Sequence, residues 1–271
     1  MSARQVRPRL ASAEASLALP TASLFGLPIS TLDTAATVAT LVRAARGELA
    51  EARAGAPFLA TYANPHTVNQ LRDERGFVDE LRRFDLLYPD GIGLVWASRA
   101  LGAALRERVT ASDFLPDFCR AAAAHGLTLF FVGGEPGVAA EAARRLAALA
   151  PGVAIAGTHP GFFASAEEER TLVERIRGLG VAACLVGMGS PRQERWMLCH
   201  AERLGAPLAW GVGGVFDFYS GRHARAPRWM RMLGIEWLHR MALEPRRLWR
   251  RYLVGNARFA ARTLFERSRL L

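Results

Sequence analysis

Tyr88-Pro89-Asp90-Gly91-Ile92-Gly93 joins a short apolar run, Phe84 to Leu87, to a helical pattern that extends from Leu94 to Leu101. A carboxylate followed by Gly-x-Gly at a strand-to-helix turn lies where open α/β sheets place their ligands, at the carboxyl ends of the strands. The two glycines allow a tight turn and let a ligand approach the backbone. We therefore take Asp90 as the candidate general base; the alternative is that it only begins the turn or caps the helix.

Short apolar segments alternate with helical patterns on both sides of this turn. The expected strands are residues 57–63, 84–88, 127–132, 153–156, 181–186 and 207–212. This alternation predicts an α/β fold with a mostly parallel sheet and helices on both faces. Glycine clusters follow three of the strands, at Gly133-Gly134, Gly187-Met188-Gly189 and residues 211–214. In a doubly wound sheet these clusters share one edge with Asp90.

The charge of the chain is concentrated at its C-terminal end. The 271 residues are 51% hydrophobic and 22% charged, which argues against global disorder. All 35 basic residues are arginines and the net charge is +10. Residues 221–271 contain 13 Arg and 3 Glu, which accounts for the whole excess. We therefore expect an anionic partner for this segment: membrane lipid, phosphate or nucleic acid.

Spacing within the tail indicates a basic helical face. Five arginines recur at intervals of 4 and 7 residues, beside aromatic and aliphatic residues: Arg247, Arg251, Arg258, Arg262 and Arg269. Such a stripe suits an anionic bilayer surface, and the alternative is a solvated charged face. We expect a disordered leader at residues 1–23, an α/β catalytic domain at 24–221 and a helical, membrane-docking appendage at 222–271. No apolar run approaches the ~20 residues of a membrane-spanning helix.

Three further motifs each have two interpretations. Asn64-Pro65 could present an amide to a ligand or could cap a helix. Gln193 follows the glycine turn in a Ser-Pro-Arg-Gln sequence, which fits either a capping box or an anion site. Arg108 and Asp113 follow the Asp90 turn. Arg108 could be a cation that binds a ligand, or it could be a surface arginine while Asp113 caps a helix.

The sequence has no clustered metal ligands, P-loop or G-x-S-x-G elbow. What remains is metal-free chemistry on an anionic ligand, with arginine as counter-charge and no cofactor.

The chain resembles the WecG/TagA/CpsF family of bacterial glycosyltransferases. The resemblance covers about residues 24–258. It rests on Asn64, the Asp90 turn, Arg108 to Asp113, Phe131-Val-Gly-Gly134, Gly157-x-x-x-Gly161-Phe-Phe, Gly187 to Glu194, Gly213-Gly214-x-Phe-Asp217-Phe-x-x-Gly221, Arg225-Ala-Pro227, Gly234-x-Glu236-Trp237-x-x-Arg240 and Glu244-Pro245-x-Arg247-x-x-Arg250-Arg251. Before the helix that is expected to begin at Asn64-Pro65, the family often has Thr-x-Asn. In this chain Thr61 lies three residues before Asn64 instead of two. The contribution of Thr61 or Tyr62 therefore stays open.

The resemblance implies a Rossmann-like fold with a C-terminal appendage that covers the active site. It implies inverting, metal-independent transfer from a UDP-sugar, of the N-acetylmannosamine or glucose type, to an undecaprenyl-diphosphate-linked sugar in cell-surface polysaccharide synthesis. Asp90 and Asn64 match catalytic positions. The substrate-binding candidates, from the resemblance and the glycine turns, are Arg108, Gly134, Gly189, Gln193, Gly213, Arg240, Arg247 and Arg250. The enzyme would work in the cytoplasm, peripherally on the inner face of the plasma membrane; assembly into a homo-oligomer is left open.

Two other classes compete with this interpretation. A nicotinamide-dependent oxidoreductase shares the α/β alternation, but the G-x-G-x-x-G fingerprint is missing. A nucleic-acid-binding protein would suit the sequence pI of about 10.9. The near-neutral first 220 residues argue against it, so we expect no nucleic-acid partner. The three cysteines form no disulfide framework, which favours a reducing compartment.

Overall fold

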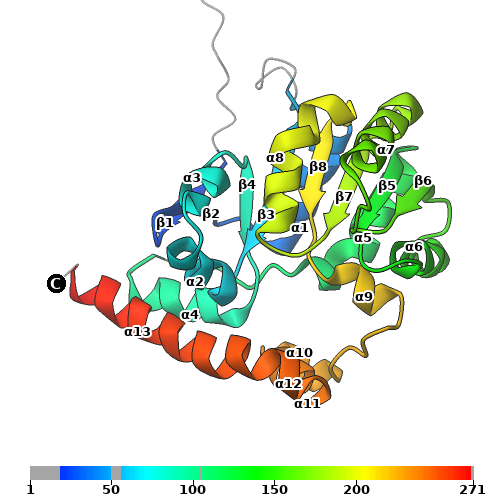
Figure 1. The fold of residues 1–271 in the computed structure, drawn as a ribbon. Helices are drawn as coiled ribbons and strands as arrows, with labels where there is room; N and C mark the ends of the chain where they lie inside the picture. Colours follow the sequence, from blue (N-terminus) through cyan, green and yellow to red (C-terminus); the bar gives the residue numbers. More distant parts are fainter. Residues whose placement is uncertain (1–18, 50–55, 104, 270–271) are drawn as a thin grey trace, which may run out of the picture.

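The computed structural model describes residues 19–49, 56–103 and 105–269, and its centre is one parallel sheet (Figure 1). The sheet has six strands in the order β4-β3-β8-β7-β5-β6, all paired in parallel. Their bounds are β3 Phe58–Ala63, β4 Leu86–Pro89, β5 Thr128–Gly133, β6 Ala154–His159, β7 Ala183–Gly187 and β8 Leu208–Gly211. The predicted Rossmann-like α/β fold is therefore confirmed.

The position of a strand within the sheet, central or at the edge, explains why β7 was predicted more accurately than β6. Every residue of the central strand β7 is buried, because helices cover both faces of the sheet there. The edge strand β6 has no buried residue and extends to His159, beyond the apolar residues 153–156 that marked it in the sequence. Its last three residues, Gly157-Thr158-His159, lack the apolar signal because an edge strand is covered less completely.

Two hydrophobic cores lie on the two faces of the sheet. One face is covered by α1 Thr34–Ala45, α5 Ala111–Ala124, α6 Val138–Leu149 and α9 Val215–Tyr219. The other is covered by α2 Pro65–Asp73, α3 Phe77–Arg82, α4 Ile92–Ala100, α7 Ala166–Leu179 and α8 Arg192–Leu204, together with the hairpin of β1 Thr21–Leu24 and β2 Leu27–Ser30. Residues 1–18 of the expected leader lie outside the described residues, and the expectation fails for residues 21–23, which pair within this hairpin.

The connections after neighbouring strands diverge at the carboxyl edge of the sheet. The chain leaves β5 and β8 toward the face of α6 and α9, but it leaves β3 and β7 toward the face of α2 and α8. Adjacent strands whose connections go to opposite faces open a crevice at their carboxyl ends, which is where ligands bind in open α/β sheets. The Asp90 turn follows β4 at this same edge.

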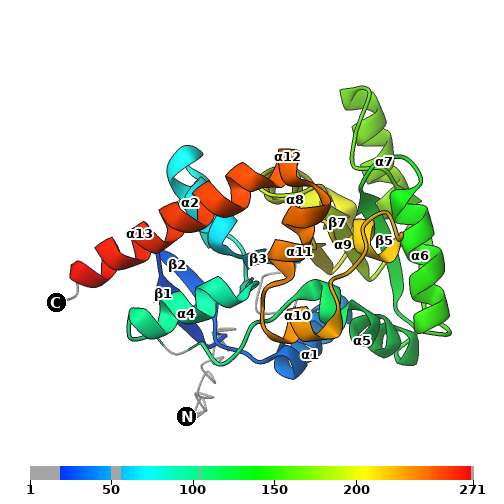
Figure 2. The same cartoon turned by 90° about the horizontal axis from the view of Figure 1, so that it is seen from below.

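The C-terminal segment crosses this edge as a chain of helices. It comprises α10 Arg228–Met232, α11 Glu236–Leu243, α12 Pro245–Trp249, a π-helical segment at Arg250–Val254 and α13 Gly255–Ser268. Figures 1 and 2 show these helices lying across the end of the molecule, with α13 alongside α2 and α4. We call residues 222–269 the appendage. Its proposed boundary, after Gly221, falls in the loop between α9 and α10.

Two arginines of the stripe predicted for the appendage contact α2 in the structure. Arg262 donates to the carbonyl of Val68 at 2.6 Å, and Arg258 lies 3.8 Å from Asp73, so both face α2. Between them, Phe259 is buried against the ring of Phe25. The π-helical turn takes more residues than an α-turn and rotates the following residues relative to the preceding ones. A constant 3.6-residue period therefore does not describe how the arginines before and after this segment are oriented relative to one another.

Candidate active site

A cavity of about 1210 Å³ lies between the carboxyl edge of the sheet and the appendage. Its walls are the Asp90 turn, the glycine turns at Gly134 and Gly189, and residues of α4, α11 and α13. This volume exceeds the ~300–1,000 Å³ that is typical of a site for one small ligand. It could accommodate two reactants side by side.

Asp90 is held in the wall of this cavity by bonds from three directions. Its backbone N–H donates to the carbonyl of Ala63 at 2.8 Å, which ties the turn to the neighbouring strand β3. The hydroxyl of Thr110 donates to Oδ1 at 2.9 Å, and the side chain of Asn64 also hydrogen-bonds the carboxylate. Burial raises the pKa of Asp90, and Thr110, Arg108 and Asn64 lower it in that order. A carboxylate whose pKa is raised binds a proton more strongly than a free carboxylate does.

Asn64 caps a helix, which is one of the two interpretations that the sequence left open, and it also lines the cavity. It is the N-cap of α2, with Oδ1 accepting from the backbone N–H of Thr67 at 3.0 Å and Pro65 at the first helical position. Because the amide oxygen is engaged by the helix, the amide nitrogen is available to the carboxylate of Asp90. The cap therefore fixes the direction of a donor in the cavity wall.

Close packing explains one glycine of the turn. A Cβ at Gly93 would lie 2.8 Å from the ring of Pro65 and 3.6 Å from Phe259. The helix that begins there therefore approaches both α2 and the appendage closely. Gly91, which precedes it, has φ of +92°, a conformation that other residues rarely adopt.

Four arginines line the cavity: Arg222, from the loop after α9, and three from other parts of the chain. Arg108 lies before α5, while Arg240 on α11 and Arg251 in the π-helical segment belong to the appendage. The guanidinium of Arg240 lies 4.9 Å above the ring of Phe218. The Nε of Arg251 is buried and has no hydrogen-bond partner among the residues that the structure describes. Burial and the charge of Arg251 lower the pKa of His66 to about 4, so this imidazole is neutral at pH 7.

The structure brings most of the candidate residues predicted from the sequence into this cavity, but not all. Those in its lining are Asn64, Asp90, Arg108, Gly134, Gly189 and Arg240. Arg250 lies outside it, exposed, with its guanidinium 5.4 Å from the ring of Trp249. The side chain of Arg247 lies outside the part of the chain that the structure describes.

Gln193 and Gly213 lie behind the cavity wall rather than in it. Gln193 is fully buried, and its Oε1 accepts from the backbone N–H of Gly213 at 2.9 Å. Its Nε2 donates to the buried carboxyl of Glu194 at 2.7 Å, and burial raises the pKa of that carboxyl. Thr61 also donates to Glu194, at 2.8 Å. This network fixes the loop after β8 against the start of α8.

Sequence reasoning missed several residues of the lining. Of the two neighbours whose contribution the sequence left open, Tyr62 lines the cavity and Thr61 donates to the buried Glu194. Thr110, Arg251 and Phe162 also line it. The alternating direction of side chains along β3 could have indicated Tyr62, because Thr61 and Tyr62 face opposite sides of the strand. The phase shift that brings in Arg251 has no comparable signal in the sequence.

Fold and cavity together describe an α/β protein with a candidate active site at the carboxyl edge of a parallel sheet, where Asp90 and arginines from two parts of the chain line one cavity. A sequence profile of the glycosyl transferase WecG/TagA/CpsF family matches residues 22–270. The chain belongs to this family and is a glycosyltransferase of cell-surface polysaccharide synthesis. Family membership implies a nucleotide-sugar donor and a lipid-linked acceptor in general terms. None of the helices in the described ranges is long and apolar enough to span a bilayer.

Proposed function

We propose that the protein is an inverting, metal-independent glycosyltransferase that transfers a sugar from a UDP-sugar to an undecaprenyl-diphosphate-linked sugar. The observation that carries this proposal is the position of Asp90. It is a hydrogen-bonded carboxylate in a cavity that is also lined by four arginines, three of them from the appendage. The family match supports the reaction class.

The donor fits the side of the cavity formed by the glycine turns. Gly134 and Gly189 have φ of +70° and +79°, and their turns precede α6 and α8. Backbone N–H groups at such helix starts favour phosphate groups. Phe162 lines the same side with 57% of its surface exposed, and the guanidinium of Arg192 lies 5.0 Å from its ring. An exposed aromatic face offers a stacking surface for a nucleobase.

The transfer is a single displacement. The carboxylate of Asp90 accepts the proton of the acceptor hydroxyl while that oxygen attacks the anomeric carbon. The bond from this carbon to the diphosphate oxygen breaks, UDP leaves with the bonding electrons, and the configuration inverts. Arg240 and Arg251 stabilise the charge that develops on the leaving diphosphate in place of a metal ion. His66 is neutral at pH 7 and therefore adds no charge of its own beside Arg251.

The acceptor fits the opposite end of the cavity, which is apolar. Its lining includes Trp96 and Ala97 from α4 and Phe259, Ala260 and Leu264 from α13. A polyprenyl chain could leave along this end while its diphosphate stays near the arginines. The appendage also exposes large apolar side chains to solvent: Trp229, Met232, Leu233, Leu238, Leu243, Trp249, Leu253, Val254, Leu264 and Phe265. We infer that these side chains insert into the cytoplasmic leaflet and place the enzyme peripherally on the membrane.

Membrane docking is tested by vesicle sedimentation. Replacing Trp249 and Leu253 with serine should lower partitioning onto phosphatidylglycerol-containing vesicles more than about tenfold, because each large apolar side chain contributes ~1.5–3 kcal/mol when buried. Serine at Leu149 and Leu179, which are similarly exposed but lie on α6 and α7, is the matched control. An equal loss in both pairs would contradict docking through the appendage.

The Thr110 hydroxyl gives a test through the pH profile. Asp90 must be ionised to accept a proton, so kcat/KM should fall as the pH drops through the pKa of Asp90. Thr110 is the largest influence that lowers this pKa, so Thr110→Val should raise it and move the acid limb of the profile to higher pH. Thr34→Val, which removes a hydroxyl bond to Glu107 instead, should leave the limb in place. A limb that moves to lower pH would exclude Asp90 as the base.

The reaction itself is tested with a synthetic lipid-diphosphate sugar and a panel of UDP-sugars. The panel includes UDP-N-acetylmannosamine, its uronic acid and UDP-glucose. UDP release that depends on both substrates, with an inverted anomeric product, is the expected result. Release with none of the donors, or a retained configuration, would refute the proposal.

A further inference from the structure

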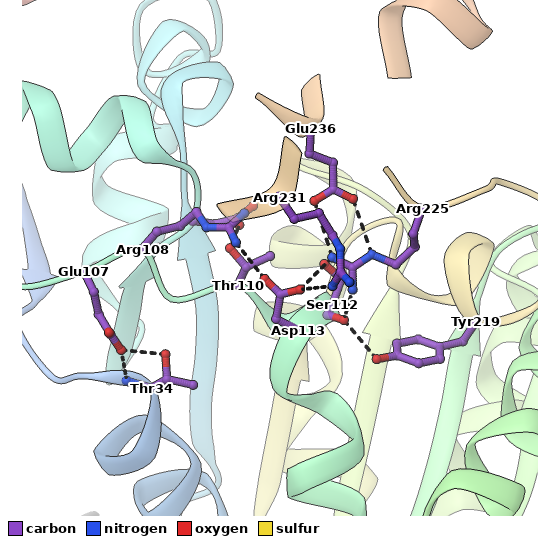
Figure 3. Close-up of polar contacts among 11 residues, drawn as sticks. Thr34, Glu107, Arg108, Thr110, Ser112, Asp113, Tyr219, Arg225, Arg231 and Glu236 are labelled. Atoms are coloured by element: carbon purple, nitrogen blue, oxygen red, sulfur yellow. Dashed lines mark hydrogen bonds and ion pairs between the residues drawn. The ribbon is translucent and has the colours of Figure 1, made fainter. Parts of the chain in front are cut away.

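One carboxylate joins the appendage to the wall of the cavity (Figure 3). Asp113 lies in the first turn of α5, and its Oδ2 is 2.8 Å from Nη2 of Arg108. Its other oxygen, Oδ1, is 2.7 Å from Nη2 of Arg225 and 3.2 Å from Nη1 of Arg231. Each oxygen of Asp113 thus serves a different part of the protein, the cavity wall or the appendage.

The surroundings of Asp113 make this arrangement specific. Its backbone N–H donates to the carbonyl of Thr110 at 2.8 Å, so the residue is fixed in the helical turn. The carbonyl of Ser112 accepts from Tyr219 at 2.9 Å and also from Arg225. Burial raises the pKa of Tyr219 to about 12, so its hydroxyl remains a donor at neutral pH. Both Arg225 and Tyr219 therefore hold the backbone of the same turn.

Charge balance links the appendage to the direction of Arg108. Arg108 has 19% of its side-chain surface exposed and Asp113 has 31%, so solvent screens their attraction only in part. A planar carboxylate cannot turn one oxygen without turning the other. Cations that hold Oδ1 therefore also orient Oδ2, which in turn holds the guanidinium of Arg108. Glu236, 3.4 Å from Arg225, keeps that arginine in reach.

We propose that Asp113 is a positioning residue that couples docking of the appendage, through Arg225 and Arg231, to the orientation of Arg108 in the cavity. The role in catalysis rests on the proposed function, since Arg108 is expected to face the donor. The same turn includes Thr110, which holds the candidate base. Seating the appendage thereby orders both a cation and the base through one turn of α5.

Amide hydrogen exchange tests the coupling without any substrate. Arg231→Gln should accelerate exchange of the amides in residues 108–113 by about fivefold, within the range for residues that share a partner. Arg228→Gln is the matched control, since Arg228 is exposed and lies one turn earlier on α10. Exchange in Arg231→Gln that equals the wild-type rate would overturn the proposal, whatever reaction the enzyme catalyses.

A mutant cycle on kcat/KM tests the catalytic consequence. If Arg231 acts only through Arg108, then Arg108→Gln should cost about tenfold and the addition of Arg231→Gln should cost little more. In the Asp113→Asn background, Arg231→Gln should have no further effect. If the losses of kcat/KM multiply in the Arg108→Gln, Arg231→Gln double variant, the coupling is overturned. It is also overturned if Arg231→Gln still lowers kcat/KM in the Asp113→Asn background. Wild-type protein inactive with every donor would instead refute the proposed function, and the exchange experiment would still decide this inference.

Discussion

Asp90→Asn should lower kcat for sugar transfer by about 10²–10⁴-fold, the range that general-base assistance provides. Asparagine has nearly the same shape and can still meet Thr110 and Asn64, but it cannot accept the proton of the acceptor hydroxyl. UDP affinity should change only a few-fold, because the donor diphosphate meets the glycine turns and arginines instead. Rates from UDP release, together with calorimetric titration of UDP, measure the two quantities separately.

Asp217 is the control for this experiment, because its side chain also belongs to the cavity lining. Asp217→Asn should retain most of kcat at saturating donor. A full loss in Asp217→Asn with little change in Asp90→Asn would transfer the role of base to Asp217. Loss of UDP binding in Asp90→Asn would instead indicate that Asp90 acts on the donor.

The fold was predictable because its signals are local and repeated. Each buried strand is a short apolar run, and the turn at Asp90 combines a strand end, a carboxylate and two glycines within a few residues. In the central sheet, the edge strand β6 was predicted too short, because its outer residues need not be apolar. The contributions of Asn64, Asp90 and Arg108 to the cavity lining could be predicted for the same reason, since each lies next to a strand end or helix start.

The remaining part of the lining depends on geometry that a sequence does not display. Gln193 sits at a helix start beside a glycine turn, as an anion-binding residue would, yet it is fully buried and bonds Gly213. Whether such an amide faces the ligand or the core depends on the packing of α8 against β8. In the appendage, Arg251 lines the cavity whereas its neighbour Arg250 does not, and the sequence alone does not show which of the two faces inward.

Arg251→Gln should therefore lower kcat/KM by about 10²–10³-fold, as expected when one preorganised donor to a developing negative charge is lost. Its neighbour Arg250 provides a matched comparison, because it has the same chemistry and lies on the opposite side of the cavity wall, exposed on Trp249. Arg250→Gln should cost less than about tenfold.

The two variants differ by one position, so the comparison tests the helical phase as well as the charge. Arg251 is buried at Nε without a partner among the described residues, and an anionic ligand would satisfy that group. Arg240→Gln should resemble Arg251→Gln, because Arg240 also lines the cavity. Initial rates at varied acceptor and donor concentrations give the values. If Arg250→Gln is the severely impaired variant and Arg251→Gln is not, the arginine suggested by the family resemblance reaches the diphosphate, and the appendage must repack when substrate binds.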